Sequence, residues 1–237
     1  MEQLSYSFIV TMLHSTWQMA LLLGMSWLLF MPRNISPLYK RNILQASLLF
    51  QVIASACTFY YTYQFYQQSK PSFLTIGLNE TLNGFQLTTF APMIFLCYLL
   101  VATYKMMKNA LGWHLFTFQY KKYIQKAPPE LKLFTNAKAL HFGIKRKVTI
   151  WCSTHITSPI TFGFFKPVIL LPVALVNSLT IQQAEALVLH ELNHIKQHDY
   201  LFNWLLIIIE NLFFFNPFVK VAARKIRMER EKNCDLQ

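Results

Sequence analysis

The feature that most constrains the fold is an apolar segment near the start of the chain, residues 8–31, which contains no Lys, Arg, Asp or Glu. A helix of this length rises about 36 Å, enough to cross the hydrocarbon core of a bilayer. Residues 43–66 and 87–104 form two further apolar segments of this kind. No basic residue precedes the first segment and no small-residue cleavage site follows it, so we interpret it as an anchor rather than a signal peptide. We therefore expect three transmembrane helices within residues 1–112.

The composition is that of a membrane protein, with 54% hydrophobic, 16% aromatic and only 14% charged residues. Much of the net charge of +12 comes from residues 105–147, where ten Lys or Arg accompany a single acid, Glu130. The link between the second and third segments has only Lys70 against Glu80. The positive-inside rule then places the N-terminus outside and everything after residue 104 in the cytoplasm. Lysines that face an anionic leaflet explain the charge, so we expect the lipid bilayer as a partner and no direct contact with nucleic acid.

The second half of the chain, residues 113–237, has the pattern of a separate α+β domain. Residues 130–142 show helical spacing of apolar side chains, and Gly143 stands where a helix stop is expected. The period then changes, and β-branched and aromatic residues separated by Gly and Pro predict the strands of a small sheet at residues 147–153, 160–165 and 168–171. The four cysteines do not suggest a disulfide framework, because they are scattered; Cys152 and Cys234 stand alone near basic residues.

The stretch VLHELNHIKQHD, residues 188–199, contains an HExxH pattern formed by His190, Glu191 and His194. On a helix this spacing puts two imidazoles on one face, with a carboxylate beside them that can serve as a general base, as in zinc peptidases. Thr180 and Gln183 form a capping-box pattern that predicts the helix start. A buried stripe is expected at Ile181, Ala184, Val188, Leu192 and Ile195. Two hydrogen-bonded core histidines, or a solvated pair, are the alternatives to a zinc site.

Zinc needs a third protein ligand and an open position for water. The candidates are Asp199, His198, Glu210, Glu229, Glu231 and Asp235. Asn216 and Pro217 predict the N-cap and first residue of a helix that runs toward the end of the chain. On that helix Glu231 and Asp235 lie one turn apart, so one carboxylate could bind the metal while the other holds a ligand histidine. Pairing of these acids with neighbouring basic side chains on a solvated surface is the alternative.

Residues 200–218 are apolar enough to raise a question of topology. As a full span they would carry Glu231 across about 30 Å of hydrocarbon, away from His190 and His194. The polar residues in this stretch favour a helix that packs on protein and only dips into the membrane; they are Asn203, Glu210, Asn211 and Asn216. We expect the dipping arrangement. A fourth span is the alternative, and it would remove Glu231 from the site.

Three motifs together resemble the BlaR/MecR-type antirepressor metallopeptidases, membrane zinc proteases of bacterial β-lactam signalling. They are SPITFGFFKPVILLP, HELNHIKQHD, and EREKNCD, which begins 39 residues after the first histidine of HELNHIKQHD. The resemblance covers the whole chain and implies several N-terminal spans followed by a cytoplasmic gluzincin-like domain. Carried over by position, it implies Zn²⁺ ligands at His190, His194 and Glu231, a general base at Glu191, and outer carboxylates at Asp235 and, in a structural role, Asp199.

The resemblance also suggests that residues 158–172 flank the active-site cleft. An exposed edge strand there, with Thr161, Phe162 and Gly163, could hold an extended peptide substrate by β-augmentation. An ordinary pair of core strands is the alternative interpretation of the same segment.

The function that the resemblance implies is that of a zinc endopeptidase in the bacterial inner (cytoplasmic) membrane, with its active site facing the cytoplasm. Its substrate would be a protein or peptide, such as a transcriptional repressor or its own chain. Sensor-transducer members of the family continue into a further span and a penicillin-binding domain, whereas this sequence ends two residues after Asp235. We expect either a fragment or a protein that works without that sensor. The sequence is compatible with a homodimer as well as a monomer.

Two rival functions remain at this point. One is a housekeeping zinc protease of membrane quality control, like the heat-shock membrane proteases that share HExxH and a downstream ExxxD. The other is a signalling scaffold that keeps the fold but does not bind the metal. Stoichiometric zinc in the purified protein would exclude the scaffold.

Overall fold

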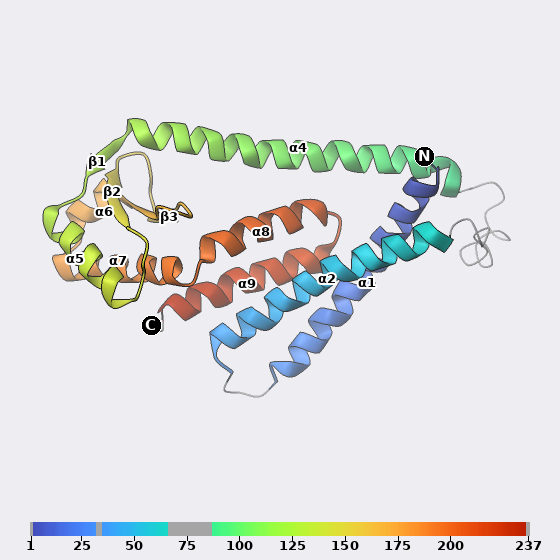
Figure 1. Cartoon of the computed structure of the whole chain (residues 1–237), viewed down its shortest axis with the longest axis horizontal. Coiled ribbons are helices and arrows are strands. Elements are labelled where there is room, and N and C mark those ends of the chain that lie inside the picture. Colours follow the sequence, from blue (N-terminus) through green and yellow to red (C-terminus); the bar gives the residue numbers. More distant parts are fainter. Residues whose placement is uncertain (1, 32–34, 66–86, 236–237) are drawn as a thin grey trace. The chain divides into compact units, whose positions relative to one another are not determined.

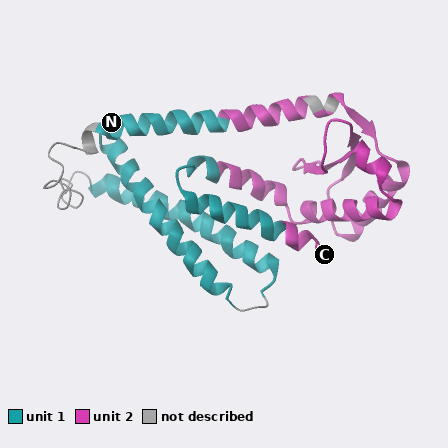
Figure 2. Cartoon of the chain, turned by 180° about the vertical axis from the view of Figure 1, so that it is seen from behind, with its two compact units in different colours: residues 1–106, 209–230 teal, residues 107–208, 231–237 magenta. Residues whose placement is uncertain are grey.

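The computed structural model describes residues 2–31, 35–65 and 87–235 (Figure 1). The link with Lys70 and Glu80 lies outside the described residues. The chain divides into two compact units, coloured separately in Figure 2. Unit 1 comprises residues 1–106 and 209–230, and unit 2 comprises residues 107–208 and 231–237. Each unit therefore combines a long continuous part of the chain with a shorter segment from near its end.

Unit 1 is helical. It contains α1 (Glu2–Leu29), α2 (Pro37–Phe65) and the first part of α4 (Leu87–Lys122). These three helices are long and apolar enough to cross a membrane, so the described residues contain as many candidate spans as expected. The third helix, however, runs well past residue 104, because the sequence offers no helix stop before the break at Pro128 and Pro129. The buried amide of Gln51 on α2 donates a hydrogen bond to Gln18 on α1 and another to Ser55 on α2 itself.

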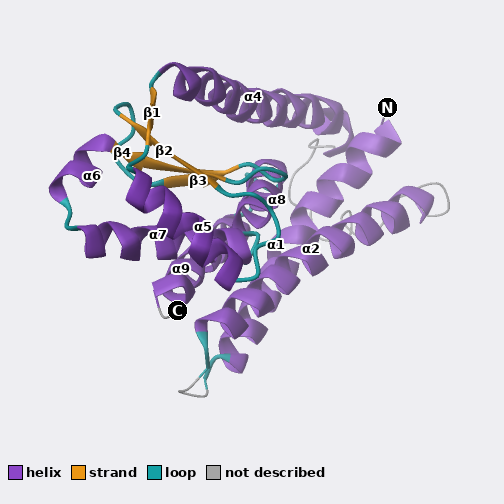
Figure 3. Cartoon of the chain, turned by 60° about the vertical axis from the view of Figure 1, so that its left-hand side comes forward, coloured by secondary structure: helices purple, strands orange, loops and turns teal. Residues whose placement is uncertain are grey.

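Unit 2 contains a four-stranded mixed sheet with the order β1-β2-β4-β3 (Figure 3). The strands are β1 (Ile124–Lys126), β2 (Thr149–Ser153), β3 (Ile160–Phe162) and β4 (Val168–Pro172). β2 and β4 are parallel, and the two edge pairs are antiparallel. The three expected strands are present, while β1 was not expected. β3 ends at Phe162 because Gly163 adopts a φ of 94°, and a Cβ there would lie 2.5 Å from the Lys166 carbonyl oxygen.

The hydrophobic core of unit 2 lies between the sheet and the helices α5 (Pro129–His141) and α7 (Ile181–Lys196), with α6 (Val173–Ser178) at its edge. The expected capping box is present at the start of α7: the Gln183 amide N–H donates to Thr180 Oγ1, and the Thr180 N–H donates to Gln183 Oε1. Four of the five residues expected in the buried stripe are buried, namely Ala184, Val188, Leu192 and Ile195. Ile181 is 60% exposed instead, because the first turn of α7 extends beyond the core.

The last two helices are α8 (Asp199–Leu212) and α9 (Pro217–Asp235). Asn216 caps α9 as expected, because its Oδ1 accepts from the backbone N–H groups of Phe218 and Val219. The Glu210 carboxylate on α8 pairs with the Arg227 guanidinium on α9. At 14 residues α8 is about 21 Å long, shorter than a bilayer-spanning helix. The last turn of α9 lies beside the end of α7, because the Asn233 side chain donates a hydrogen bond to Gln197.

Candidate metal centre

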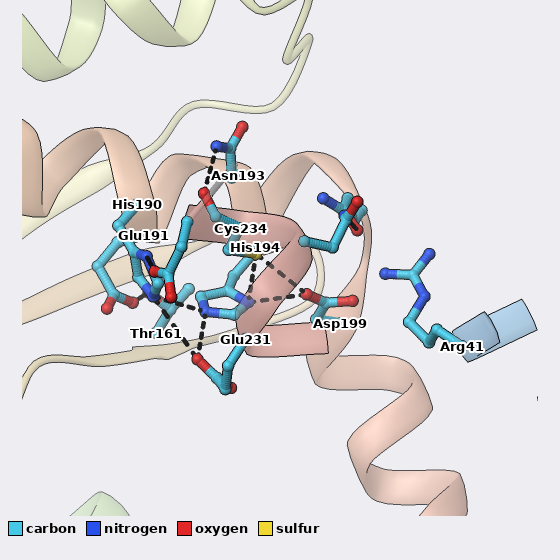
Figure 4. Close-up of polar contacts among 12 residues, drawn as sticks. Arg41, Thr161, His190, Glu191, Asn193, His194, Asp199, Glu231 and Cys234 are labelled. Carbon is cyan, nitrogen blue, oxygen red and sulfur yellow. Dashed lines mark hydrogen bonds and ion pairs between the residues drawn. The ribbon is translucent and has the colours of Figure 1, made fainter. Parts of the chain in front are cut away.

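The two histidines of the HExxH pattern project from the same face of α7, one turn apart (Figure 4). Their Nε2 atoms lie 3.2 Å from each other, and the ring planes are inclined by 80°. Both side chains are partly buried, His194 more deeply than His190. The opposite face of α7 is fixed in the core through Val188 and Leu192, so the histidines have little freedom to separate. Two unprotonated imidazole nitrogens at this separation are a natural ligand pair for one cation.

The end of α9 brings Glu231 to the two histidines. Its Oε2 lies 3.6 Å from His190 Nε2 and 3.5 Å from His194 Nε2. The position of this end of α9 is fixed by a hydrogen bond of 2.9 Å from Asn233 Nδ2 to Gln197 Oε1, just after α7. The structure thus places the expected third ligand beside the first two. A carboxylate oxygen and two imidazole nitrogens converge on one point (Figure 4).

The triangle formed by these three atoms has the size that zinc requires. Ligand atoms about 2.0–2.1 Å from a tetrahedral zinc ion are about 3.3–3.4 Å from one another. The three separations here are 3.2, 3.5 and 3.6 Å, so one ion can reach all three atoms with little rearrangement. The Glu231 side chain is 49% exposed, which leaves a solvent-facing side for a fourth ligand. The donor set therefore fits zinc with an open position for water.

Each histidine also has a carboxylate on its other ring nitrogen. His194 Nδ1 lies 2.7 Å from Asp199 Oδ2, and His190 Nδ1 lies 3.2 Å from Asp235 Oδ1. An Nδ1–H that donates to a carboxylate leaves Nε2 as the free acceptor, which is the tautomer a metal needs. Asp199 is buried, whereas the Asp235 side chain is largely exposed. Asp199 begins α8 directly after His198, which adopts a φ of 57° and so turns the chain sharply at the end of α7.

The electrostatics around His194 favour its protonated form when no metal is bound. Burial lowers the pKa of this imidazole, but hydrogen bonds with Asp199, Cys234 and Glu231 raise it, and the net pKa is about 11. A metal ion would supply the positive charge that these groups stabilise. Proton and metal therefore compete for the same imidazole.

Glu191 stands between the histidines in sequence and is 7% exposed. The Thr161 hydroxyl on the edge strand β3 donates a hydrogen bond to its Oε2. This contact connects the expected base to the strand that was expected to bind substrate, and it holds the carboxylate in one orientation. One of the three residues expected to bind substrate, Thr161, thus contacts the HExxH motif directly.

The other two residues expected to bind substrate have different surroundings. The Phe162 ring is buried and packs edge-on against Phe116 and Tyr120 of α4. Its side chain is thus committed to packing, and its backbone is the part that remains for a peptide. Gly163 makes the turn that ends β3, because its positive φ suits glycine.

Two residues that frame the centre were not expected from the sequence. Cys234, interpreted as an isolated cysteine, is 3% exposed and its Sγ lies 3.3 Å from His194 Nδ1. Its position three residues after Glu231 on a helix could have indicated a shared face. Arg146 donates hydrogen bonds to the carbonyl oxygens of Phe164 and Ile195 and to the Tyr200 hydroxyl. No sequence pattern indicated that Arg146 joins the β3–β4 turn to the end of α7.

Among the described residues, two groups of side chains could hold a metal ion. The first is His190, His194 and Glu231, and the second is His194, Asp199 and Cys234. The second group uses Nδ1 of the same His194 ring, and two of its members, Asp199 and Cys234, are buried. A buried group of this kind offers a water molecule little access, so the first group suits a catalytic site better. The remaining third-ligand candidates belong to neither group; they are His198, Glu210, Glu229 and Asp235.

The fold and this centre define a class, that of membrane metallopeptidases with an HExxH helix. The comparison with protein families agrees with that class. Residues 9–237 match the family described as BlaR1 peptidase M56, and the chain belongs to this family.

Curated relatives carry regulatory names. The chain is 36% identical over 91 residues to the methicillin resistance mecR1 protein of Staphylococcus aureus strain Mu50, covering 38% of this chain and 16% of the relative. It is 34% identical over 105 residues to the regulatory protein BlaR1 of Bacillus licheniformis, covering 44% of this chain and 17% of the relative. With the regulatory protein BlaR1 of Staphylococcus aureus it shares 27% identity over 151 residues, covering 61% of this chain and 24% of the relative. The chain thus matches less than a quarter of the length of these relatives.

Proposed function

We propose that this chain is a zinc-dependent endopeptidase of the bacterial cytoplasmic membrane, with residues 113–237 as its peptidase domain. The observation that carries the proposal is the triangle of His190, His194 and Glu231 atoms, whose edges of 3.2 to 3.6 Å match a tetrahedral zinc site. Membership of the M56 peptidase family supports a metal-dependent peptidase.

Each residue of the centre has a distinct task in this mechanism. When bound, zinc polarises the scissile carbonyl and makes a water molecule more acidic. Glu191 takes a proton from the attacking water and passes it to the leaving amine. The Thr161 hydroxyl orients the Glu191 carboxylate, while Asp199 and Asp235 keep the two imidazoles in the required tautomer. A substrate in extended conformation pairs with β3, whose outer edge has no strand partner in the sheet of described residues.

The biological role that we propose is regulatory proteolysis. The relatives are named as regulatory and methicillin-resistance proteins, which supports a role in signalling. A protein substrate such as a transcriptional repressor, or a segment of the chain itself, fits an endopeptidase with this role. We further propose that the N-terminus lies outside the cell and the metal centre faces the cytoplasm, since residues 105–147 are strongly basic.

The first test is the zinc content of the purified protein, measured by elemental analysis. We expect about one zinc per chain in the wild type and in Glu191→Ala, and loss of zinc in His190→Ala and Glu231→Ala. Glu229→Ala is the matched control, because Glu229 lies on the same helix but belongs to neither ligand group. Wild-type protein without zinc would favour a scaffold that keeps the fold. Full zinc in Glu231→Ala would show that the third ligand is another group.

The second test separates catalysis from metal binding. Membranes that contain the wild type or Glu191→Gln are incubated, and fragments of the chain and of a co-expressed candidate repressor are followed by immunoblot. Glu191→Gln should retain zinc and lose cleavage, because the amide cannot accept the proton of the attacking water. Equal cleavage by both proteins would refute the assignment of Glu191 as the base.

A further inference from the structure

Unit 2 contains a cavity of about 680 Å³ that is separate from the metal ligands. It is lined by β1, the first half of α5, β2 and α6, elements that lie together in Figures 1 and 3. None of the residues that line it belongs to the metal centre or to β3. Its volume falls in the range of about 300–1,000 Å³ that is typical of small-molecule sites.

The floor of the cavity is apolar. Ile150 and Cys152 alternate along β2, so their side chains point to the same face of the sheet, and both are buried. Val173 and Val176 of α6 complete this floor and pack against the same core. Burial raises the pKa of the Cys152 thiol, which keeps it uncharged. A floor of this kind receives the apolar body of a ligand.

All the charged residues that line the cavity are basic. Lys126, Lys132 and Lys147 line the cavity, and no Asp or Glu does. None of these three lysines has an ion-pair partner among residues 2–31, 35–65 and 87–235. Lys132 and Asn136 lie one turn apart on α5, so an ammonium group and an amide share one helix face. A carboxylate or phosphate would find several donors here and no repelling charge.

We propose that this cavity binds a small amphipathic anion, with one carboxylate or phosphate group on an apolar body. The charged group pairs with the lysines while the apolar body covers Ile150, Cys152 and the two valines. An extended acidic peptide fits less well, because its backbone would bring polar groups onto an apolar floor. The floor also belongs to the core that supports α7, so an occupant stabilises the unit that carries the metal centre.

The test measures binding and so does not depend on peptidase activity. Protein in phosphatidylcholine nanodiscs is dialysed to equilibrium against radiolabelled octanoate, with empty nanodiscs as the blank. Octyltrimethylammonium, which has the same chain length and the opposite charge, is the matched probe. We expect saturable octanoate binding above the blank and none of the cation.

Two sets of variants assign the binding to the cavity. Replacing Lys126, Lys132 and Lys147 together by Gln should weaken octanoate binding about tenfold or more, the effect of losing charge-assisted contacts. The control replaces three lysines that do not line the cavity and changes the net charge equally: Lys122, Lys145 and Lys166. It should alter binding less than about twofold. Val176→Trp fills the cavity without changing its charge and should also abolish binding.

Several outcomes would overturn the proposal. The first is the absence of saturable octanoate binding, and the second is equal binding of octyltrimethylammonium. The variants would overturn it if both lysine triples lost octanoate binding equally, or if a folded Val176→Trp protein bound octanoate unchanged. Displacement of octanoate by a polyglutamate peptide at lower concentration than by decanoate would also overturn it. Nanodiscs with phosphatidylglycerol distinguish the source of the anion. Octanoate binding that is lost there identifies an anionic lipid as the occupant, and binding that persists identifies a free acid. Both results support an amphipathic anion.

Discussion

The two carboxylates behind the histidines should contribute unequally to metal affinity. Asp199 is 2% exposed and lies 2.7 Å from His194 Nδ1, whereas the Asp235 side chain is 67% exposed and lies 3.2 Å from His190 Nδ1. Loss of such an outer partner typically costs about 10- to 100-fold in metal affinity. The buried, shorter contact is screened less by water. Asp199→Asn should therefore weaken zinc binding about 100-fold, and Asp235→Asn should weaken it about tenfold or less. The difference corresponds to about 1.4 kcal/mol.

The assay is competition for zinc with a fluorescent chelator of known affinity, on protein first stripped of metal. Asparagine keeps the size of the side chain and removes its charge, and Glu229→Gln on α9 is the control. Asp199 also begins α8, so Asp199→Asn weakens the helix-dipole interaction by about 0.3–1 kcal/mol, which thermal unfolding of the metal-free protein measures separately. An equal or larger loss of zinc affinity in Asp235→Asn would refute the reasoning from burial.

Three further predictions concern the neighbours of the metal. Thr161→Val should retain zinc but lower turnover about tenfold with little change in KM, because the hydroxyl no longer orients Glu191; a change confined to KM in peptide-cleavage kinetics would contradict this. Arg146→Lys keeps the charge but loses the forked guanidinium donor, so it should lower the free energy of unfolding by about 1–2 kcal/mol. Lys145→Ala is the control and should have little effect; thermal unfolding measures both variants. Because the pKa of His194 is about 11 without metal, above its ordinary value, the ring is protonated at neutral pH and zinc must displace that proton. Zinc binding should release a proton and strengthen about tenfold per pH unit between about pH 7 and 9, which calorimetry in buffers of different ionisation enthalpy measures; a pH-independent affinity would refute it.

The sequence predicted most of the secondary structure around the candidate centre because the main signals are local. The capping box at Thr180, the HExxH spacing on α7 and the Asn216 cap each depend on residues within one turn of a helix. Strand positions followed from short β-branched runs bounded by Gly and Pro. β1 was not predicted because it has only three residues and forms a strand only through its pairing with β2.

What the sequence did not predict is tertiary. Cys234 was taken for an isolated cysteine, since its contact with His194 spans 40 residues and depends on how α9 returns. Arg146 lies in a loop, and its bonds to Phe164, Ile195 and Tyr200 exist only once three elements have been assembled. Contacts of this kind have no period along the chain, so no pattern of spacing can indicate them.

The ends of α8 and α9 support the dipping arrangement that we propose for residues 200–218. A straight span through this apolar stretch would need about 20 residues of helix, but α8 ends at Leu212 and the chain turns at Asn216. The charged Glu210 is costly in hydrocarbon unless paired, and the guanidinium of Arg227 on α9 supplies the opposite charge. Breaking that pair with Arg227→Ala leaves an uncompensated carboxylate on α8. In the proposed site the charge pair and the Glu231 ligand depend on one another, because Arg227 and Glu231 lie on the same helix, α9.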